Sequence, residues 1–153
     1  MSVQMMIFTV GDQRYAVELS FIREIITYRS ITRMPDSPPW VIGIVETRLQ
    51  AMPIIDLRIR FQTDLTPVYH DKTVIIATKL TDGKLLGLVV DSVEDIGSFS
   101  DQEIISGEKI ETRIKSSVVK GYIEQPANSI LILDHLCFAE FNAIPSLVEN
   151  AHE

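Results

Sequence analysis

Cysteine and histidine are scarce in this chain of 153 residues. Cys137 is the one cysteine, so no disulfide can form within the chain, which fits a reducing cytosol. The three histidines are His70, His135 and His152. His135 and Cys137 lie two positions apart, on different faces of a helix, and a zinc site needs about four ligands. We therefore expect no metal site and interpret the pair as a solvated histidine and a buried thiol.

Basic residues are also few. The chain has 14 Lys and Arg against 21 Asp and Glu, a net charge of −7, and its cations are scattered singly. Nucleic-acid phosphates bind to basic patches, so this balance argues against a nucleic-acid partner. Aromatic residues make up 7% of the chain. An oligonucleotide-binding barrel would need a basic groove and aromatic stacking platforms, so that fold is disfavoured too.

Long hydrophobic runs are missing. No run approaches the roughly 20 apolar residues that span a bilayer. The first residues, MSVQMMIFTVG, lack the positive start and long apolar stretch of a secretory signal. We expect a cytoplasmic protein with no direct membrane insertion. Hydrophobic residues still form 46% of the chain, enough for the core of one domain or two small subdomains.

Catalytic motifs are absent as well. No Ser–His–Asp arrangement can be assembled, and glycine spacings similar to a phosphate loop lack the following Lys-Ser/Thr. Asp56 and Asp91 both end apolar strands, and two carboxylates could serve acid–base chemistry. No second catalytic group accompanies either one, so we interpret each as an acceptor of backbone hydrogen bonds. A small hydrolase or metal enzyme would need a convergent polar constellation, so we predict a protein without enzymatic activity or cofactor.

What the chain does contain is short apolar strands separated by turn residues. In the central stretch, residues 40–61 (WVIGIVETRLQAMPIIDLRIRF), two strands at 41–45 and 50–55 flank a polar turn. The turn carries Arg48, either as a solvated residue or as a contact that the strands hold in place.

Three residues of this stretch predict local backbone features. Gly43 suggests a bulge or a close backbone approach. Pro53 lacks an amide hydrogen, so its strand should be an edge strand or bulged. Asp56 can cap a helical turn that follows it.

The remaining segments continue the pattern. Ser20 could cap a helical turn at Phe21–Ile25, although strand alternation could also claim Glu24–Tyr28. Residues 97–117 are expected to be irregular, and Asp134 to cap a helix running to about Ala143. Further strands are expected at Met5–Val10, Tyr15–Leu19, Thr73–Lys79, Lys84–Val90, Ser117–Ile123 and Ser129–Leu133, with a hairpin turn at Thr81-Asp82-Gly83. About nine or ten short strands joined by tight turns predict a mainly antiparallel protein, with two small barrels favoured over one large one.

The order of these segments resembles the CheW family, the coupling proteins of bacterial chemotaxis. The resemblance covers roughly residues 5–140 without large gaps. It rests on the collinear set FTVGDQRYAVEL, FIREI, ITRMPDSPPWVIGI, Arg48, MPIIDLRIRF, TVIIATKL, GLVVDSVEDI and LILDHL. Within that set, IIDLR and GLVVDSV are the most telling pieces.

The resemblance implies a fold, partners and a location. The fold would be two five-stranded, SH3-like β-barrel subdomains with one or two short helices and a C-terminal helix. Residues 1–144 would form one CheW-like domain, and 145–153 a flexible tail. The protein would be a non-enzymatic scaffold that bridges the regulatory domain of the histidine kinase CheA to the cytoplasmic tip of methyl-accepting chemoreceptors. It would be recruited to receptor arrays at the inner membrane and could self-associate through its barrels.

The resemblance also implies a groove between the barrels that binds a receptor helical hairpin. Apolar groups would contact the hairpin, and an arginine would pair with a carboxylate on it. The positions that match the family's binding residues are Ile22, Glu24, Gly43, Arg48, Val93 and Ile96.

The central turn departs from the family pattern. Where the family usually has Asn-Leu-Arg-Gly, this chain has Glu46-Thr47-Arg48-Leu49. Leucine replaces the turn glycine, and Glu46 places a carboxylate two residues from Arg48, where the two could pair. This departure leaves open an alternative function, a CheW-like adaptor for a different chemosensory, motility or polar-localisation system.

Overall fold

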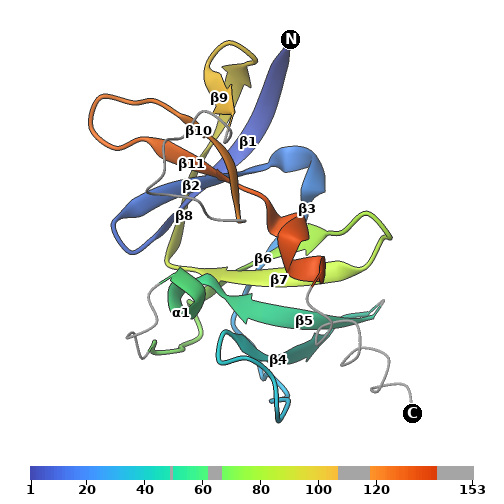
Figure 1. Ribbon diagram of the computed structural model, residues 1–153. Coiled ribbons are helices and arrows are strands. Elements are labelled where there is room, and N and C mark those ends of the chain that lie inside the picture. The colour runs from blue at the N-terminus through green and yellow to red at the C-terminus, as the bar shows by residue number, and fades with distance from the viewer. Residues whose placement is uncertain (49, 62–66, 107–117, 141–153) are drawn as a thin grey trace.

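Two β-sheets form the framework of the computed structural model, which describes residues 1–48, 50–61, 67–106 and 118–140. Figure 1 shows the first sheet above the second. The first sheet contains β1 (Ser2–Val10), β2 (Gln13–Glu18), β8 (Ser92–Ser100), β9 (Ile104–Ser106), β10 (Val119–Ile123) and β11 (Ile130–Leu133). The second contains β3 (Ile22–Thr27), β4 (Val41–Glu46), β5 (Ala51–Asp56), β6 (Val74–Lys79) and β7 (Leu85–Val90). Three short helices complete the described chain: a 3₁₀ turn at Leu19–Phe21, α1 (Leu57–Phe61) and a 3₁₀ helix at His135–Glu140.

Each sheet combines sequence-local hairpins with one parallel pairing. The first sheet has the order β8-β1-β2-β11-β10-β9, with β11 parallel to β2. The second has the order β3-β6-β7-β5-β4, with β5 parallel to β7. The mainly β class with two subdomains is therefore as expected from the sequence. The first sheet has six strands instead of five, and the pairings among the described residues do not close either sheet into a barrel.

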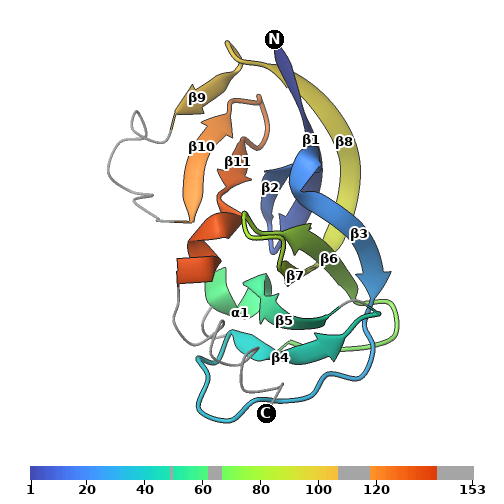
Figure 2. The ribbon, with the colours of Figure 1, turned by 90° about the vertical axis from the view of Figure 1, so that its right-hand side faces the viewer.

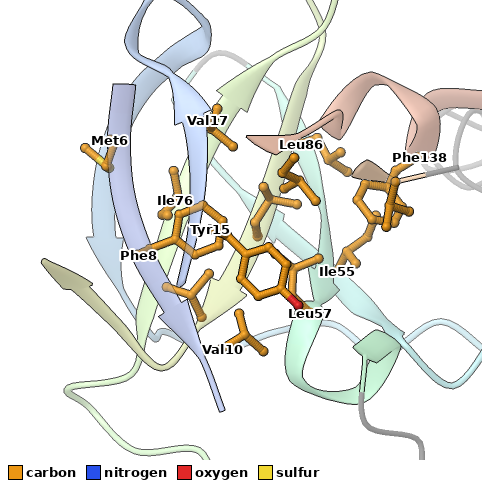
Figure 3. Close-up of a cluster of buried hydrophobic side chains, with 14 of the residues drawn as sticks. Met6, Phe8, Val10, Tyr15, Val17, Ile55, Leu57, Ile76, Leu86 and Phe138 are labelled. Atoms are coloured by element: carbon orange, nitrogen blue, oxygen red, sulfur yellow. The ribbon is translucent and has the colours of Figure 1, made fainter. Parts of the chain in front are cut away.

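One hydrophobic core joins the two sheets. Phe8, Tyr15 and Val17 enter it from the first sheet, and Ile55 and Leu86 from the second (Figure 3). Two smaller clusters lie on either side, one within each sheet. Because the largest cluster takes residues from both sheets, burial of this shared apolar surface holds the two subdomains together.

The predicted hairpins are confirmed. β1 and β2 pair from Met5 opposite Glu18 to Val10 opposite Gln13. β6 and β7 pair around the expected Asp-Gly turn, where Gly83 has a φ of 86° that favours glycine. The bulge expected at Gly43 is also present, because the β4–β5 register shifts between Val41 and Gly43.

Other sequence-based expectations were wrong. Of the two alternatives for the segment after Ser20, the helical turn at Phe21–Ile25 is wrong and the strand is confirmed: β3 covers Ile22–Thr27, and Phe21 ends a 3₁₀ turn that has no side-chain cap. Ile25 is exposed on this edge strand. Together with Ile22 and Ile26 it produces apolar residues three and four positions apart, a spacing that is also typical of a helix. Residues 97–106 are not irregular, because β8 continues to Ser100 along β1 and β9 pairs with β10. In each case long-range pairing overrides a weak local pattern.

Pro53 does not mark an edge strand, but its ladder with β4 is bulged, with the extra residue on β4. β5 lies between β4 and β7, and Pro53 pairs with Ile44 of β4. The parallel ladder with β7 begins only at Ile54, so the proline lies just outside it. At the chain's end, the expected helix after Asp134 is a 3₁₀ helix as far as Glu140. The tail expected at 145–153 lies outside the described residues.

Candidate functional site

Two of the six predicted binding residues lie on β3, an edge strand of the second sheet. Glu24 is exposed and lies opposite Ala77 of β6. Ile22 is half-buried and packs against the shared core. Only Glu24 of the two therefore offers most of its side chain to a partner.

Arg48 lies in the turn between β4 and β5 and is exposed. Contacts between Thr47 and Gln50 close this turn. The Thr47 amide and hydroxyl donate to the Gln50 carbonyl at 2.9 and 2.7 Å, and the Gln50 amide donates to the Thr47 hydroxyl at 3.1 Å. The Gln50 side chain also accepts from the Leu85 amide at 3.1 Å, which ties the turn to β7. Within the described residues Glu46 and Arg48 form no ion pair, and Leu49 lies outside them.

The β3 strand and the β4–β5 turn line one surface pocket of about 350 Å³. It brings together Glu24 and Arg48 of the predicted set. Arg23, Thr47 and Leu85 complete its lining. Sequence reasoning missed these three. It also missed a β-bulge in β3, where Ile22 lies opposite Thr78 and Glu24 opposite Ala77 so that the pairing skips Arg23.

Gly43 lies outside this pocket and has a structural role. Its φ is 148°, and a Cβ added there would lie 2.3 Å from the carbonyl oxygen of Thr32. That carbonyl accepts from the Ile44 amide at 2.8 Å, while the Thr32 amide donates to the Ile44 carbonyl at 2.9 Å. Glycine at this position therefore lets the chain after β3 pair with the outer edge of β4.

Val93 and Ile96 lie on β8, the edge strand of the other sheet. Val93 lies opposite Phe8 and packs partly against the shared core, as Ile22 does from β3. Ile96 is 49% exposed. The strands β3 and β8 both run along the right-hand side of Figure 2. The predicted set thus divides into a polar pocket, two half-buried aliphatic residues, one exposed isoleucine and one structural glycine.

The IIDLR segment forms a buried ion pair. Arg58 donates two side-chain hydrogen bonds to the Asp56 carboxylate, each of 3.0 Å, and its amide donates to Asp56 at 2.9 Å. The Tyr69 hydroxyl donates to the same carboxylate at 2.5 Å. The Asp91 carboxylate accepts from the Gly11 amide at 2.6 Å. The interpretation of both aspartates as acceptors of backbone hydrogen bonds is therefore confirmed.

The environment of this pair shifts two ionisation equilibria. Burial lowers the pKa of the Arg58 guanidinium, but the hydrogen bond and the charge of Asp56 outweigh it, so the net shift is upward. Burial raises the pKa of Tyr69, and the hydrogen bond to Asp56 raises it further. Both groups therefore stay protonated near neutral pH, which suits a structural ion pair.

The expectation of a solvated histidine is wrong for His135, and the thiol of Cys137 is only partly buried. His135 is 2% exposed, and its Nε2 lies 3.0 Å from the Lys79 carbonyl oxygen. Cys137 is half-buried. Burial lowers the pKa of His135, so the ring is neutral near pH 7 and donates to that carbonyl. Nowhere in the described ranges do three or more His, Cys, Asp or Glu side chains gather as metal ligands would.

A family model of the CheW-like domain matches residues 4–138. The chain belongs to the CheW-like domain family. That match spans most of the chain and both sheets, so the predicted family is confirmed. Across the described residues, this CheW-like domain has no helix long and apolar enough to cross a membrane.

Curated relatives and a solved structure agree with this assignment. The CheW-like domain is 29% identical over 149 residues to a probable chemotaxis protein CheW of Rhizobium etli, covering 96% of this chain and 90% of the relative. It is 26% identical over 151 residues to the chemotaxis protein CheW of Klebsiella aerogenes, covering 97% and 90%. The crystal structure of the scaffolding protein TtCheW from Thermoanaerobacter tengcongensis superposes with a TM-score of 0.80 at 25% identity, covering 93% of this chain and 95% of that one.

These comparisons confirm the predicted class, a chemotaxis scaffold of the CheW type. They do not test the six binding residues, which stay predictions.

Proposed function

We propose that this CheW-like domain couples the cytoplasmic tip of methyl-accepting chemoreceptors to the regulatory domain of the histidine kinase CheA. It acts as a non-enzymatic scaffold in the cytoplasm and is recruited to receptor arrays at the inner membrane. Residues 1–144 act as one domain made of two subdomains. The single observation that carries the proposal is the family match over residues 4–138, which spans both sheets.

The pocket beside β3 supports a role in protein binding. Glu24 and Arg48 come from segments more than 20 positions apart and line the same depression. Exposed charges at the rim of an interface govern orientation and specificity. On the other sheet, Ile96 offers exposed apolar surface on an edge strand, where a partner's apolar residues can be buried. An edge strand of this kind also makes a second copy of the chain a possible partner.

The central turn favours one alternative, a CheW-like adaptor for a different chemosensory, motility or polar-localisation system. Glu46 and Thr47 stand where the family usually has Asn-Leu. In this chain Thr47 and Gln50 close the turn through mutual hydrogen bonds. A turn with its own closing contacts can present Arg48 to a partner in a different geometry.

The test is a titration of the full chain against the CheA regulatory domain of its own cell, and separately against the receptor tip. Arg48→Glu should weaken binding by about tenfold or more while leaving thermal unfolding nearly unchanged, because the side chain is exposed and charge reversal at an interface is repulsive. Arg29→Glu is the matched control, since Arg29 is also exposed but lies outside the pocket. Binding of the kinase alone would favour the alternative adaptor. Binding of neither would refute the coupling function.

A further inference from the structure

A second surface pocket, of about 360 Å³, shares no lining residue with the pocket beside β3. Its wall comes from the loop between β3 and β4, the start of β4, α1 and the segment before β6. Most of the lining is apolar, including Met34, Pro39, Val41 and Ile59. A cleft of this size and composition takes a small ligand or a few apolar side chains.

Two features of the pocket indicate what binds there. Val68 lies between the lining residues Pro67 and Tyr69 and is 74% exposed, so the apolar surface continues past the rim. Arg33 lines the pocket, is exposed and has no ion-pair partner among the described residues. A segment that fits this surface should therefore combine aliphatic side chains with a carboxylate.

The last described residues lie next to this pocket. The 3₁₀ helix at His135–Glu140 follows β11 of the first sheet but lies against the second sheet (Figures 1 and 2). Its Phe138 ring lies 5.9 Å from the Trp40 ring. Trp40 stands between Pro39 and Val41, which both line the pocket. The chain therefore leaves this helix beside the wall of the pocket.

The residues that follow have the matching composition. Residues 141–153 read FNAIPSLVENAHE, with no Lys or Arg. Ile144, Leu147 and Val148 are aliphatic, and Glu149 follows them directly. One short segment therefore carries both the aliphatic side chains and the carboxylate that the pocket suits.

The segment 141–153 can also reach the pocket. The Ile144-Pro145 pair favours an extended backbone, because a residue before proline avoids the helical region. Leu147 is seven positions beyond Glu140, and seven extended residues span up to about 25 Å, enough to pass Trp40. A short link holds such a segment at a millimolar effective concentration, so a weak contact suffices. A second copy of the chain would need a comparable protein concentration to compete.

We propose that residues 144–149 bind in the pocket of the same chain, with their aliphatic side chains against the apolar wall and Glu149 paired with Arg33. The tail expected to be flexible at 145–153 then begins only after Glu149. The proposal does not depend on the coupling function, because the two pockets share no residue. The bound segment covers this face of the second sheet, and a partner that binds here has to displace it.

The methionines of the full chain provide the probe. Met34 lines the pocket, whereas Met5, Met6 and Met52 lie one in each of the three buried core clusters. Labelling the methionine methyl groups therefore gives one signal from the pocket and three internal controls for the fold. We expect nuclear Overhauser effects between the Met34 methyl and the methyls of residues 144–148. They should be unchanged on dilution, and the Met34 methyl should be protected from a soluble paramagnetic agent.

Variants of the full chain test each part of the contact. Leu147→Asp should remove the protection of the Met34 methyl, because a carboxylate is unfavourable against an apolar wall. Arg33→Glu should weaken the protection by repulsion from Glu149, and Arg33→Glu/Glu149→Arg should restore it. Arg29→Glu is the matched control, since Arg29 is an exposed arginine of the same loop outside the lining, and it should keep the protection.

Three outcomes would overturn the proposal. The first is a wild type without contacts between the Met34 methyl and the segment, or with the same exposure as Leu147→Asp. The second is a set of contacts that weaken on dilution, because the segment would then come from a second copy. The third is protection that appears only when the receptor tip or the kinase regulatory domain is added, which would assign the pocket to that partner. Unchanged signals from the three buried methionines show that a variant is folded, and the wild-type contacts test the proposal without any variant.

Discussion

Replacing Asp56 with alanine removes the acceptor at the centre of the buried ion pair. Asp56 is fully buried, and the Arg58 side chain is 10% exposed. The substitution removes two side-chain hydrogen bonds from Arg58, one from its amide and one from the Tyr69 hydroxyl. Among the described carboxylates, the Arg58 guanidinium would keep only Asp91, whose nearest oxygen lies 4.0 Å away, and it would still lie 5.1 Å from the centre of the Tyr69 ring.

The expected cost is large because a charge stays buried without its partner. Breaking a buried ion pair from one side costs about 3–5 kcal/mol. A domain of this size is stable by only about 5–15 kcal/mol, so the loss is a substantial fraction of the total. Combining Asp56→Ala with Arg58→Met removes both charges, and the double variant should recover about 0.5–3 kcal/mol relative to the sum of the single changes.

Urea unfolding followed by far-ultraviolet circular dichroism measures this effect. With a slope of about 2 kcal/mol per molar urea, a loss of about 4 kcal/mol lowers the midpoint by about 2 M. Tyr69→Phe is the control for the hydroxyl alone and should cost about 1–3 kcal/mol, as for a hydrogen bond to a charged group. A midpoint for Asp56→Ala within about 0.5 M of the wild type would refute the reasoning, because the pair would then contribute no more than a solvated surface pair.

Three further outcomes follow from the same structure. Gly83→Ala should cost roughly 1–2 kcal/mol in urea unfolding, because Gly83 has a positive φ. Gly43→Ala should cost well over that, because of these two glycines only Gly43 has a backbone atom within 3 Å of an added Cβ. Burial lowers the pKa of His135 in the folded protein, so as the pH falls the unfolded chain binds the proton before the folded protein does. The free energy of unfolding should therefore decrease as the pH is lowered through about 6.5. A His135→Gln variant whose free energy of unfolding falls equally steeply with pH would contradict this. Val93→Asp should lower the melting temperature because Val93 packs on the core, whereas Ile96→Asp, at an exposed site, should leave melting nearly unchanged and affect only partner binding.

Local chemistry made several features of this domain predictable from the sequence. The Asp-Gly turn before β7 was predictable because a tight hairpin needs a residue that tolerates positive φ. The bulge at Gly43 was predictable for a related reason, since an isolated glycine in a strand indicates close backbone approach. Asp56 was recognised as a cap from its position alone, and its carboxylate does accept the amide two residues later.

Features that depend on distant segments were not predictable in this way. Arg23 adjoins Glu24 in sequence, and regular strand alternation would place their side chains on opposite faces. The bulge in the pairing of β3 with β6, which skips Arg23, cannot be read from either residue alone. His135 carried no local sign of burial, because its surroundings come from Phe21 and from the Lys79 carbonyl. The continuation of β8 beyond Gly97 likewise depends on its pairing with β1.

The sequence by itself determined where most strands lie, that the protein is mainly β, and which family it resembles. The strand positions and the fold class follow from residue-level preferences, because branched side chains favour strands and glycine and aspartate favour turns. The family followed from the resemblance of collinear segments such as IIDLR and GLVVDSV. Only the tertiary structure decided the two parallel pairings, the core shared by both sheets and the pocket that combines Arg23 with Arg48. Those features arise when segments far apart in the chain are brought together. The free energy that selects among such arrangements comes from burial of the whole apolar surface and not from any local pattern.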